Sequence, residues 1–308
     1  MNATKNITLE NKYIIHKIIG EGAHGTVFSA KNSNTNEDVV VKIDSSILLK
    51  NEARIYRLFT NTNGIPNMRS FGKEGDYNYI VMDKLGMSLE DLFQHNKGGI
   101  SLQKVIMIGI QLIKRIQSVH LNNIIHRDVK PENFMLGAST RTQNIVHIID
   151  FGLSKLYSIQ GKHVEMKTGR SAIGTLDYIS LNVHRGCTPS RRDDMESIGY
   201  ILLYLLGGKL PWMESLGKKR STNLSGNQEE SVERKIYEIK NSCMLWNIDI
   251  DNNIDIPGEF ITFIQYCRSL TYDQMPDYNY LSSLLTNLFK MKQFSIEQSF
   301  FSTTTSPQ

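Results

Sequence analysis

The chain has few cysteines. Its 308 residues include three, Cys187, Cys243 and Cys267, and no two of them form a CxxC pair. This wide separation excludes the close ligand spacing of a structural metal site. We therefore expect free thiols in a reducing compartment, and predict an intracellular protein of the cytoplasm, the nucleus or both.

Long hydrophobic runs are also missing. The first residues, MNATKNITLENK, contain no apolar segment typical of a signal peptide. The most apolar stretches, residues 105–116 and 198–206, are interrupted by Gly, Gln or Lys and are too short to cross a bilayer. We predict no membrane association.

The sequence has no long basic stripe. Its net charge is +4, which suits an anionic ligand such as a nucleotide or an acidic peptide. The excess is too small to predict nucleic-acid binding. With 40% hydrophobic and 21% charged residues, the composition is that of a soluble globular protein with one large domain or two lobes.

Local patterns predict an α+β fold in two parts. Residues 13–19, 26–30 and 38–43 are short runs rich in Val, Ile and aromatics, which predict an antiparallel meander. One helix is predicted over residues 45–59 and a further strand over 77–82. After residue 86 helical spacing prevails, at 100–123, 191–208, 259–270 and 279–289.

These patterns divide the chain into successive segments, and no internal repeat is visible. We predict an N-terminal extension (1–12), a small sheet lobe with one helix (13–85), a larger, mostly helical lobe (86–295) and a C-terminal tail (296–308). The polar residues 215–231 predict a mobile loop within the larger lobe.

A glycine-rich segment, GEGAHGTV at residues 20–27, lies between two predicted strands. A dinucleotide-binding turn would instead join a strand to a helix, so the context indicates a hairpin that closes over phosphates. An ordinary Gly-rich hairpin is the alternative. The residues expected at a nucleotide here are Ile19, Gly20, Glu21, Gly22, Ala23, His24, Gly25, Thr26 and Val27.

Lys42 ends the apolar run VVVK at residues 39–42. It could be a fixed cation for the α and β phosphates of a nucleotide if a carboxylate held it in place, and Glu52 on the following helix is available. The alternative is a surface lysine whose alkyl chain lies along apolar neighbours.

Residues 126–133, HRDVKPEN, place many polar groups beside the apolar run Phe134–Leu136. Burying such groups is costly unless each finds a partner or a ligand. Asp128 could accept the proton of an attacking hydroxyl, Lys130 could reach a transferred phosphoryl group, and the amide of Asn133 could bind Mg²⁺. A polar turn with a structural aspartate is the alternative.

The run IVHIIDFGL at residues 145–153 predicts a buried strand that ends at Asp150. A carboxylate in such a place needs a cation, and a Mg²⁺ ion on nucleotide phosphates would provide one. Asp150 follows Asp128 by 22 positions, and the four motifs occur in the order glycine loop, lysine, HRD, DFG. This order makes chance agreement improbable.

With these motifs the chain resembles a eukaryotic protein kinase from about residue 13 to residue 295. Lys130 in the HRD segment is typical of the serine/threonine class. The closer resemblance is to the casein kinase 1 family, which has Ser-Ile-Asn where most kinases have Ala-Pro-Glu; here Ser180-Leu181-Asn182 occurs. The segments behind this resemblance are LGMSLEDLF (85–93), KPENFMLG (130–137), GTLDYISLN (174–182), SRRDDMESIGY (190–200), LPW (210–212), YCRSL (266–270) and PDYNYL (276–281).

The resemblance implies a bilobal kinase fold, a Mg-ATP-dependent transfer of phosphate to Ser or Thr of proteins, and a monomer. It assigns Lys42 and Glu52 to a phosphate-clamping ion pair, and Asp194 to a brace under the catalytic loop. The remaining assignments are Asp128 as proton acceptor, Asn133 and Asp150 as metal ligands, Met82 as gatekeeper, Asp83 to Leu85 as the adenine-binding hinge, and Leu136 as part of the nucleotide site.

The chain departs from the casein kinase 1 pattern in three places. Ala23-His24 replace a small residue and a phenylalanine at the tip of the glycine loop. Asp177 stands where relatives have an arginine that binds a substrate phosphate, and Ile236 where they tend to have a lysine. An acid and an apolar side chain cannot hold a phosphate, so we expect a weakened preference for phosphate-primed substrates, partly compensated by Arg170 and the loop cations Lys218, Lys219 and Arg220.

Two other functions share parts of this pattern. A pseudokinase scaffold would only bind nucleotide, but such proteins usually lose a residue of the set Lys42, Asp128 and Asp150, all present here. A small-molecule phosphotransferase shares the two acids, but the lysine of KPEN and the SRRDDMESIGY helix argue against it. We therefore predict an active kinase whose partners are Ser/Thr-containing proteins, acidic ones included.

Overall fold

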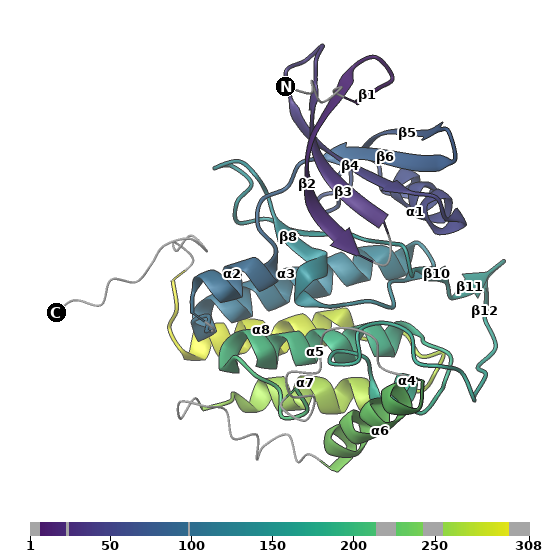
Figure 1. The fold of residues 1–308 in the computed structure, drawn as a ribbon. Helices are drawn as coiled ribbons and strands as arrows, with labels where there is room; N and C mark the ends of the chain where they lie inside the picture. The colour runs from purple at the N-terminus through teal and green to yellow at the C-terminus, as the bar shows by residue number, and fades with distance from the viewer. Residues whose placement is uncertain (1–6, 23–24, 98, 214–225, 243–254, 296–308) are drawn as a thin grey trace.

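The computed structural model describes residues 7–22, 25–97, 99–213, 226–242 and 255–295. A twisted sheet with one helix forms the upper lobe and a group of helices forms the lower lobe (Figure 1). The predicted α+β fold with a small antiparallel sheet lobe and a larger helical lobe is therefore confirmed.

The upper sheet is antiparallel throughout, with strand order β1-β2-β3-β4-β6-β5. Successive side chains of β6 point to opposite faces: Tyr79 and Val81 join a small outer cluster, whereas Ile80 and Met82 face the main core. The strands are β1 Thr8–Leu9, β2 Tyr13–Gly22, β3 Gly25–Asn32, β4 Asp38–Asp44, β5 Met68–Glu74 and β6 Tyr77–Asp83. The predicted meander corresponds to β2, β3 and β4.

Helix α1, Ile47–Leu58, packs against this sheet through Leu49, Ala53 and Tyr56. Their spacing of three and four residues puts them on one face of the helix. Glu52 lies on the same buried face and is 1% exposed. The helix thus carries a carboxylate beneath the sheet, next to the end of β4.

The lower lobe is built around helix α5, whose residues from Asp193 to Gly207 are all buried. It packs against α3 and α7, and Gly208 ends it with a φ of +83°. The helices are α2 Leu89–His95, α3 Leu102–Leu121, α4 Leu181–His184, α5 Arg191–Gly207, α6 Gly226–Ser242, α7 Gly258–Ser269 and α8 Tyr278–Met291. No helix in the described part of the chain is both long and apolar enough to span a membrane.

Short strands and a turn of 3-10 helix follow α3 along the chain, and the HRD and DFG segments lie among the first of them. The strands form three small antiparallel pairs, β7 with β10, β8 with β9 and β11 with β12. Their bounds are β7 Ile124–Ile125, η1 Pro131–Asn133, β8 Phe134–Leu136, β9 Val146–Ile148, β10 Lys155–Leu156, β11 Ser158–Ile159 and β12 Lys162–His163.

Two predicted segment boundaries differ from the structure. β1 lies within the predicted extension of residues 1–12 and adds a strand to the sheet. Helix α6 begins at Gly226, so the predicted loop at residues 215–231 was too long, because Gln and Glu residues at its end favour a helix. The rest of that loop and the tail at 296–308 lie outside the described residues.

Candidate active site

Lys42 joins three separate parts of the chain. From β4 its Nζ lies 2.8 Å from Oε2 of Glu52 on α1 and 2.8 Å from Oδ1 of Asp150, just after β9. The lysine is 6% exposed. The alternative of a surface lysine is therefore wrong, and the predicted pair with Glu52 is present.

The charges of this group depend on one another. Burial alone would lower the pKa of Lys42, but Glu52 and Asp150 together raise it above its ordinary value. Burial raises the pKa of the Glu52 carboxyl to about 7, although Lys42 opposes the change. Lys42 is thus charged at neutral pH. Glu52 loses its proton at a pH close to neutral.

Asp150 has a backbone φ of +63°, which non-glycine residues seldom adopt. Its N–H donates to the hydroxyl of Tyr56 at 3.1 Å. The next residue, Phe151, is buried with its ring centroid 5.0 Å from that of Tyr56 and 5.5 Å from that of Phe59. This packing against α1 holds the strained turn that turns Asp150 toward Lys42.

Asp128 is the most heavily contacted residue of the HRD segment. Its Oδ2 lies 2.9 Å from Nζ of Lys130 and accepts from Nδ2 of Asn133 at 3.0 Å. Its Oδ1 accepts from both the N–H and the hydroxyl of Thr175, at 3.1 and 2.8 Å. Lys130 and Asn133 thus both contact the Asp128 carboxylate, so the three residues lie together as predicted.

The backbone under this segment is held by Asp194 of α5. Its carboxylate accepts from the N–H groups of His126 at 2.7 Å and Arg127 at 2.9 Å. Burial alone would raise the pKa of Asp194, but the hydrogen bond from His120 and further contacts lower it, so a buried anion braces the loop. The predicted brace is therefore found in the structure.

A sequence model of the protein kinase domain matches residues 13–278, more than half of the chain. The chain belongs to the protein kinase family. This kinase is therefore a phosphotransferase with protein substrates, and its family uses a nucleotide together with a divalent metal.

The glycine loop of the kinase is the hairpin between β2 and β3, with Ala23 and His24 outside the described residues. At Gly25 φ is +106° and a Cβ would lie 2.4 Å from the carbonyl oxygen of Ile43, so only glycine fits. At Gly22 a Cβ would meet no described protein atom within 4 Å. No described part of the protein requires a glycine there, and the open space suits the close approach of a phosphate.

The other predicted nucleotide-binding residues lie on strands of the upper sheet and on β8 below it. Ile19, Gly20 and Glu21 lie on β2, Thr26 and Val27 on β3, Met82 and Asp83 at the end of β6, and Leu136 on β8. The N–H of Gly86 donates to the carbonyl of Leu136 at 2.7 Å, which ties the connection after β6, containing Leu85, to the lower lobe. Asp83 accepts from Arg69 and Asn67, so its side chain fixes the connection.

The donor set fits a divalent metal. Because Nδ2 of Asn133 donates to the carbonyl and carboxylate of Asp128, its Oδ1 is the part of the amide left for a metal. Asp150 adds a carboxylate. Mg²⁺ is commonly held by one or two protein oxygens, with phosphates and water completing its shell, so these two residues fit it.

Among the described residues, Arg170, Asp177 and Ile236 lie in different surroundings, and Lys218, Lys219 and Arg220 lie outside the described residues. Exposed Arg170 lines a cavity of about 200 Å³ together with the cations Arg127, Lys155 and Lys167. Asp177 is 9% exposed, and its carbonyl accepts from Nε1 of Trp212 at 2.8 Å. Ile236 is fully buried.

Sequence reasoning missed the role of Thr175 as a partner of Asp128. The preceding Gly174 allows this approach, because its φ is +103° and a Cβ would lie 2.5 Å from the carbonyl oxygen of Arg127. The adjacent Gly-Thr in GTLDYISLN was the available signal, but the contact spans 47 positions of sequence.

Proposed function

We propose that this protein is a Mg-ATP-dependent serine/threonine protein kinase of casein kinase 1 type, with a weakened preference for phosphate-primed sites. The observation that carries the proposal is the convergence of Lys42 on Glu52 and Asp150, opposite the cluster around Asp128. Asn133 links the two groups, because its carbonyl accepts from the N–H of Ile149 beside Asp150 while its side chain donates to Asp128. Cationic, metal-binding and proton-accepting groups thereby lie together, as phosphoryl transfer requires.

Each residue then has a distinct role. Lys42, steadied by Glu52, binds the nucleotide phosphates, and Asn133 and Asp150 hold the metal. When bound, ATP would supply the γ-phosphoryl group, and the magnesium ion would neutralise negative charge on the phosphates. Asp128 orients the substrate hydroxyl and accepts its proton, while Lys130, 2.9 Å from that carboxylate, balances negative charge beside it.

The casein kinase 1 type is supported by how Ser180 holds the segment that lacks Ala-Pro-Glu. Ser180 is fully buried, accepts from the N–H of Val183 at 3.1 Å and donates to Oδ1 of Asp193 at 2.5 Å. The serine of Ser180-Leu181-Asn182 thus anchors the segment to α5. Serine/threonine specificity is supported by Lys130 beside Asp128.

Weak recognition of a priming phosphate follows from Asp177 and Ile236. A carboxylate repels phosphate and a buried isoleucine offers no donor. The cations around Arg170 could instead attract acidic protein substrates. We further propose that the kinase acts as a monomer in the cytoplasm, the nucleus or both, a compartment that suits its free thiols.

The test is phosphate transfer from γ-labelled ATP with magnesium to dephosphorylated casein. We expect label on serine and threonine, and an Asp128→Asn variant slowed by roughly 10²- to 10⁴-fold. Asp76→Asn, in an exposed turn, is the matched control. Nucleotide binding with no transfer by the unaltered protein would favour the pseudokinase scaffold, and label on tyrosine would contradict the proposed specificity.

A further inference from the structure

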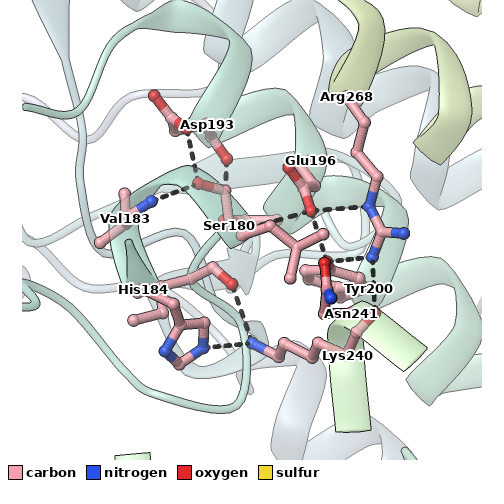
Figure 2. A network of polar contacts seen from close by, with 12 residues as sticks. Ser180, Val183, His184, Asp193, Glu196, Tyr200, Lys240, Asn241 and Arg268 are labelled. Carbon is pink, nitrogen blue, oxygen red and sulfur yellow. Dashed lines mark hydrogen bonds and ion pairs between the residues drawn. The ribbon is translucent and has the colours of Figure 1, made fainter. Parts of the chain in front are cut away.

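Lys240 on α6 is a second buried lysine, and its 0% exposure is lower than that of Lys42. Its Nζ donates to the carbonyl oxygens of Leu176 and Ile179, both at 2.8 Å, and contacts Nε2 of His184 at 3.2 Å (Figure 2). An ammonium has three protons, and all three have an acceptor here. None of these acceptors is a carboxylate.

Aromatic rings and an ion pair surround this ammonium. The ring centroids of Tyr200 and Trp212 lie 4.9 and 5.0 Å from its Nζ, within the range of cation–π attraction. Glu196 is also buried and pairs with Arg268 at 3.1 Å, as Figure 2 shows. Carbonyl oxygens, the His184 ring and two ring faces contact the ammonium directly, and the charges of Glu196 and Asp177 stabilise it further.

The segment that Lys240 holds is the one that reaches Asp128. Leu176 directly follows Thr175, whose N–H and hydroxyl both donate to the Asp128 carboxylate. The carbonyl between the two lysine acceptors, that of Asp177, accepts from Trp212. Thr175 borders Asp128 and therefore also the place where the acceptor hydroxyl must lie, while Asp177, Tyr178 and Ile179 are buried behind it.

We propose that Lys240 is a positioning residue for the protein substrate: its ammonium holds residues 176–179 against the catalytic loop, and substrate affinity therefore depends on the charge at this position. The inference rests on the proposed function only in taking Asp128 as the place of the acceptor hydroxyl. A neutral amine has two N–H groups and a lone pair, so it cannot satisfy three acceptors at once.

This dependence has a pH signature. Burial lowers the pKa of Lys240 to about 7, although Glu196 and Asp177 oppose the change and Arg268 adds to it. Burial also lowers the pKa of His184 to about 3, so its ring stays a neutral acceptor, and raises those of Tyr200 to a high value and Asp193 to about 6. Glu233 lies 3.9 Å from Nδ1 of His184 and faces Lys240 across that ring. Lys240 is thus the group of this cluster that loses charge above neutral pH.

Folding stability should respond in the opposite direction. Because the folded-state pKa of Lys240 lies below its ordinary value of 10.5, the unfolded chain binds more protons between about 7 and 10.5. The contribution of Lys240 to the free energy of unfolding therefore rises with pH across this window, whereas substrate affinity falls. A purely structural lysine would not make stability and substrate affinity change in opposite directions with pH.

The experiment measures binding of fluorescently labelled, dephosphorylated casein to the full chain, saturated with magnesium and a non-hydrolysable ATP analogue, at pH 6.5 and 8.5. For the unaltered protein we expect the Kd to rise roughly fivefold between these values, the equivalent of about one hydrogen bond. Lys240→Met should bind weakly at both pH values. Lys240→Arg, charged throughout, should lose the pH dependence, and Lys235→Met, an exposed lysine of the same helix, should match the unaltered protein.

The outcomes separate this inference from the proposed function. Unchanged casein affinity in Lys240→Met, or an equal loss of affinity for the ATP analogue, would overturn the role of Lys240. If Lys240→Met does not fold, a flat pH profile of the unaltered protein overturns it instead. Casein binding without phosphate transfer contradicts only the proposed function, and no casein binding at either pH contradicts both.

Discussion

At the scale of single residues, the two buried lysines show how partners decide the state of a charge. Lys42 has two carboxylates at 2.8 Å, which raise its pKa, while Lys240 has carbonyl and imidazole acceptors, and burial lowers its pKa to about 7. Lys42 is therefore a permanent cation suited to phosphates. Lys240 is a cation that loses its proton, and with it its charge, as the pH rises through about 7.

Glu52 should make nucleotide use depend on pH. Its pKa of about 7 lies above the ordinary value of 4.5, so its contribution to stability is present below about 4.5 and is lost as pH rises through 7. Its ionised form pairs with Lys42, so kcat/KM for ATP at saturating casein should rise between pH 6 and 8. Steady-state rates across this range check the expectation.

Glu52→Gln supplies the comparison. We expect kcat/KM for ATP at pH 8 to fall roughly 100-fold in this variant, with the pH dependence between 6 and 8 removed. Glu74→Gln, on an exposed part of β5, is the control. A pH profile that Glu52→Gln leaves unaltered would contradict the assignment.

Asp177 should determine the response to a priming phosphate. We expect a peptide with phosphoserine three residues before its acceptor serine to show nearly the same kcat/KM as its unphosphorylated twin, because Asp177 repels the phosphate and Ile236 cannot bind it. Asp177→Arg should raise the ratio of the two values roughly tenfold, as a charged hydrogen bond would.

Two results would contradict this argument. One is a strong preference of the unaltered protein for the primed peptide, which would place the phosphate at the cations around Arg170. The other is an Asp177→Arg variant that folds normally and shows no change in the ratio. Asp76→Arg controls for added charge at an exposed position.

Contacts between site residues could be predicted where the residues belong to one short motif. Asp128, Lys130 and Asn133 lie within six positions, so their meeting is local. Thr175 and Lys240 could not be predicted in the same way, because their contacts cross 47 and 61 to 64 positions and depend on how α5 and α6 pack. A lysine in a polar helix also carries no sign that it is buried.

At the scale of elements, the hairpin of β2 and β3 contains two glycines that differ in the space around them. Gly25 is required by the fold, whereas Gly22 has space around it. We expect Gly22→Ala to raise the KM for ATP several-fold while changing the free energy of unfolding by less than about 1 kcal/mol. Denaturant titration and ATP kinetics measure the two quantities.

Gly25→Ala is the contrasting variant, since its Cβ would overlap the backbone of β4. It should lose about 1–3 kcal/mol of stability as well as ATP affinity. Gly99→Ala, with no described atom near its Cβ, is the control. An unaltered KM in Gly22→Ala would argue against a phosphate beneath this hairpin.

Elements with a clear apolar period could be predicted, and those stabilised by distant partners could not. The helices predicted over residues 100–123 and 191–208 correspond to α3, Leu102–Leu121 with C-cap Asn122, and α5, Arg191–Gly207 with C-cap Gly208. β5, with the sequence MRSFGKE, has no such run and depends on its pairing with β6. α6 is polar along most of its length, so only its packing reveals Ile236 and Lys240 as buried.

At the scale of the whole molecule, the lobes meet both at the site and away from it, where Arg115 of α3 donates to the carbonyl of Asn63 and the N–H of Ile148 to that of Gly64. Lys42 and Tyr56 of the upper lobe contact Asp150, and Phe59 stacks on Phe151. The order of the motifs predicted that Lys42 and Asp150 would meet, and their contact joins the two lobes at the site.

The central claim is that both lobes form a single magnesium-nucleotide site beside Asp128. A crystal structure of the kinase with magnesium and a non-hydrolysable ATP analogue tests it most directly. The account predicts an ion about 2.0–2.1 Å from Oδ1 of Asn133 and a carboxylate oxygen of Asp150, with Lys42 on the phosphates. A nucleotide-filled, metal-free cleft in which the carboxylates of Asp128 and Asp150 face apart would contradict it.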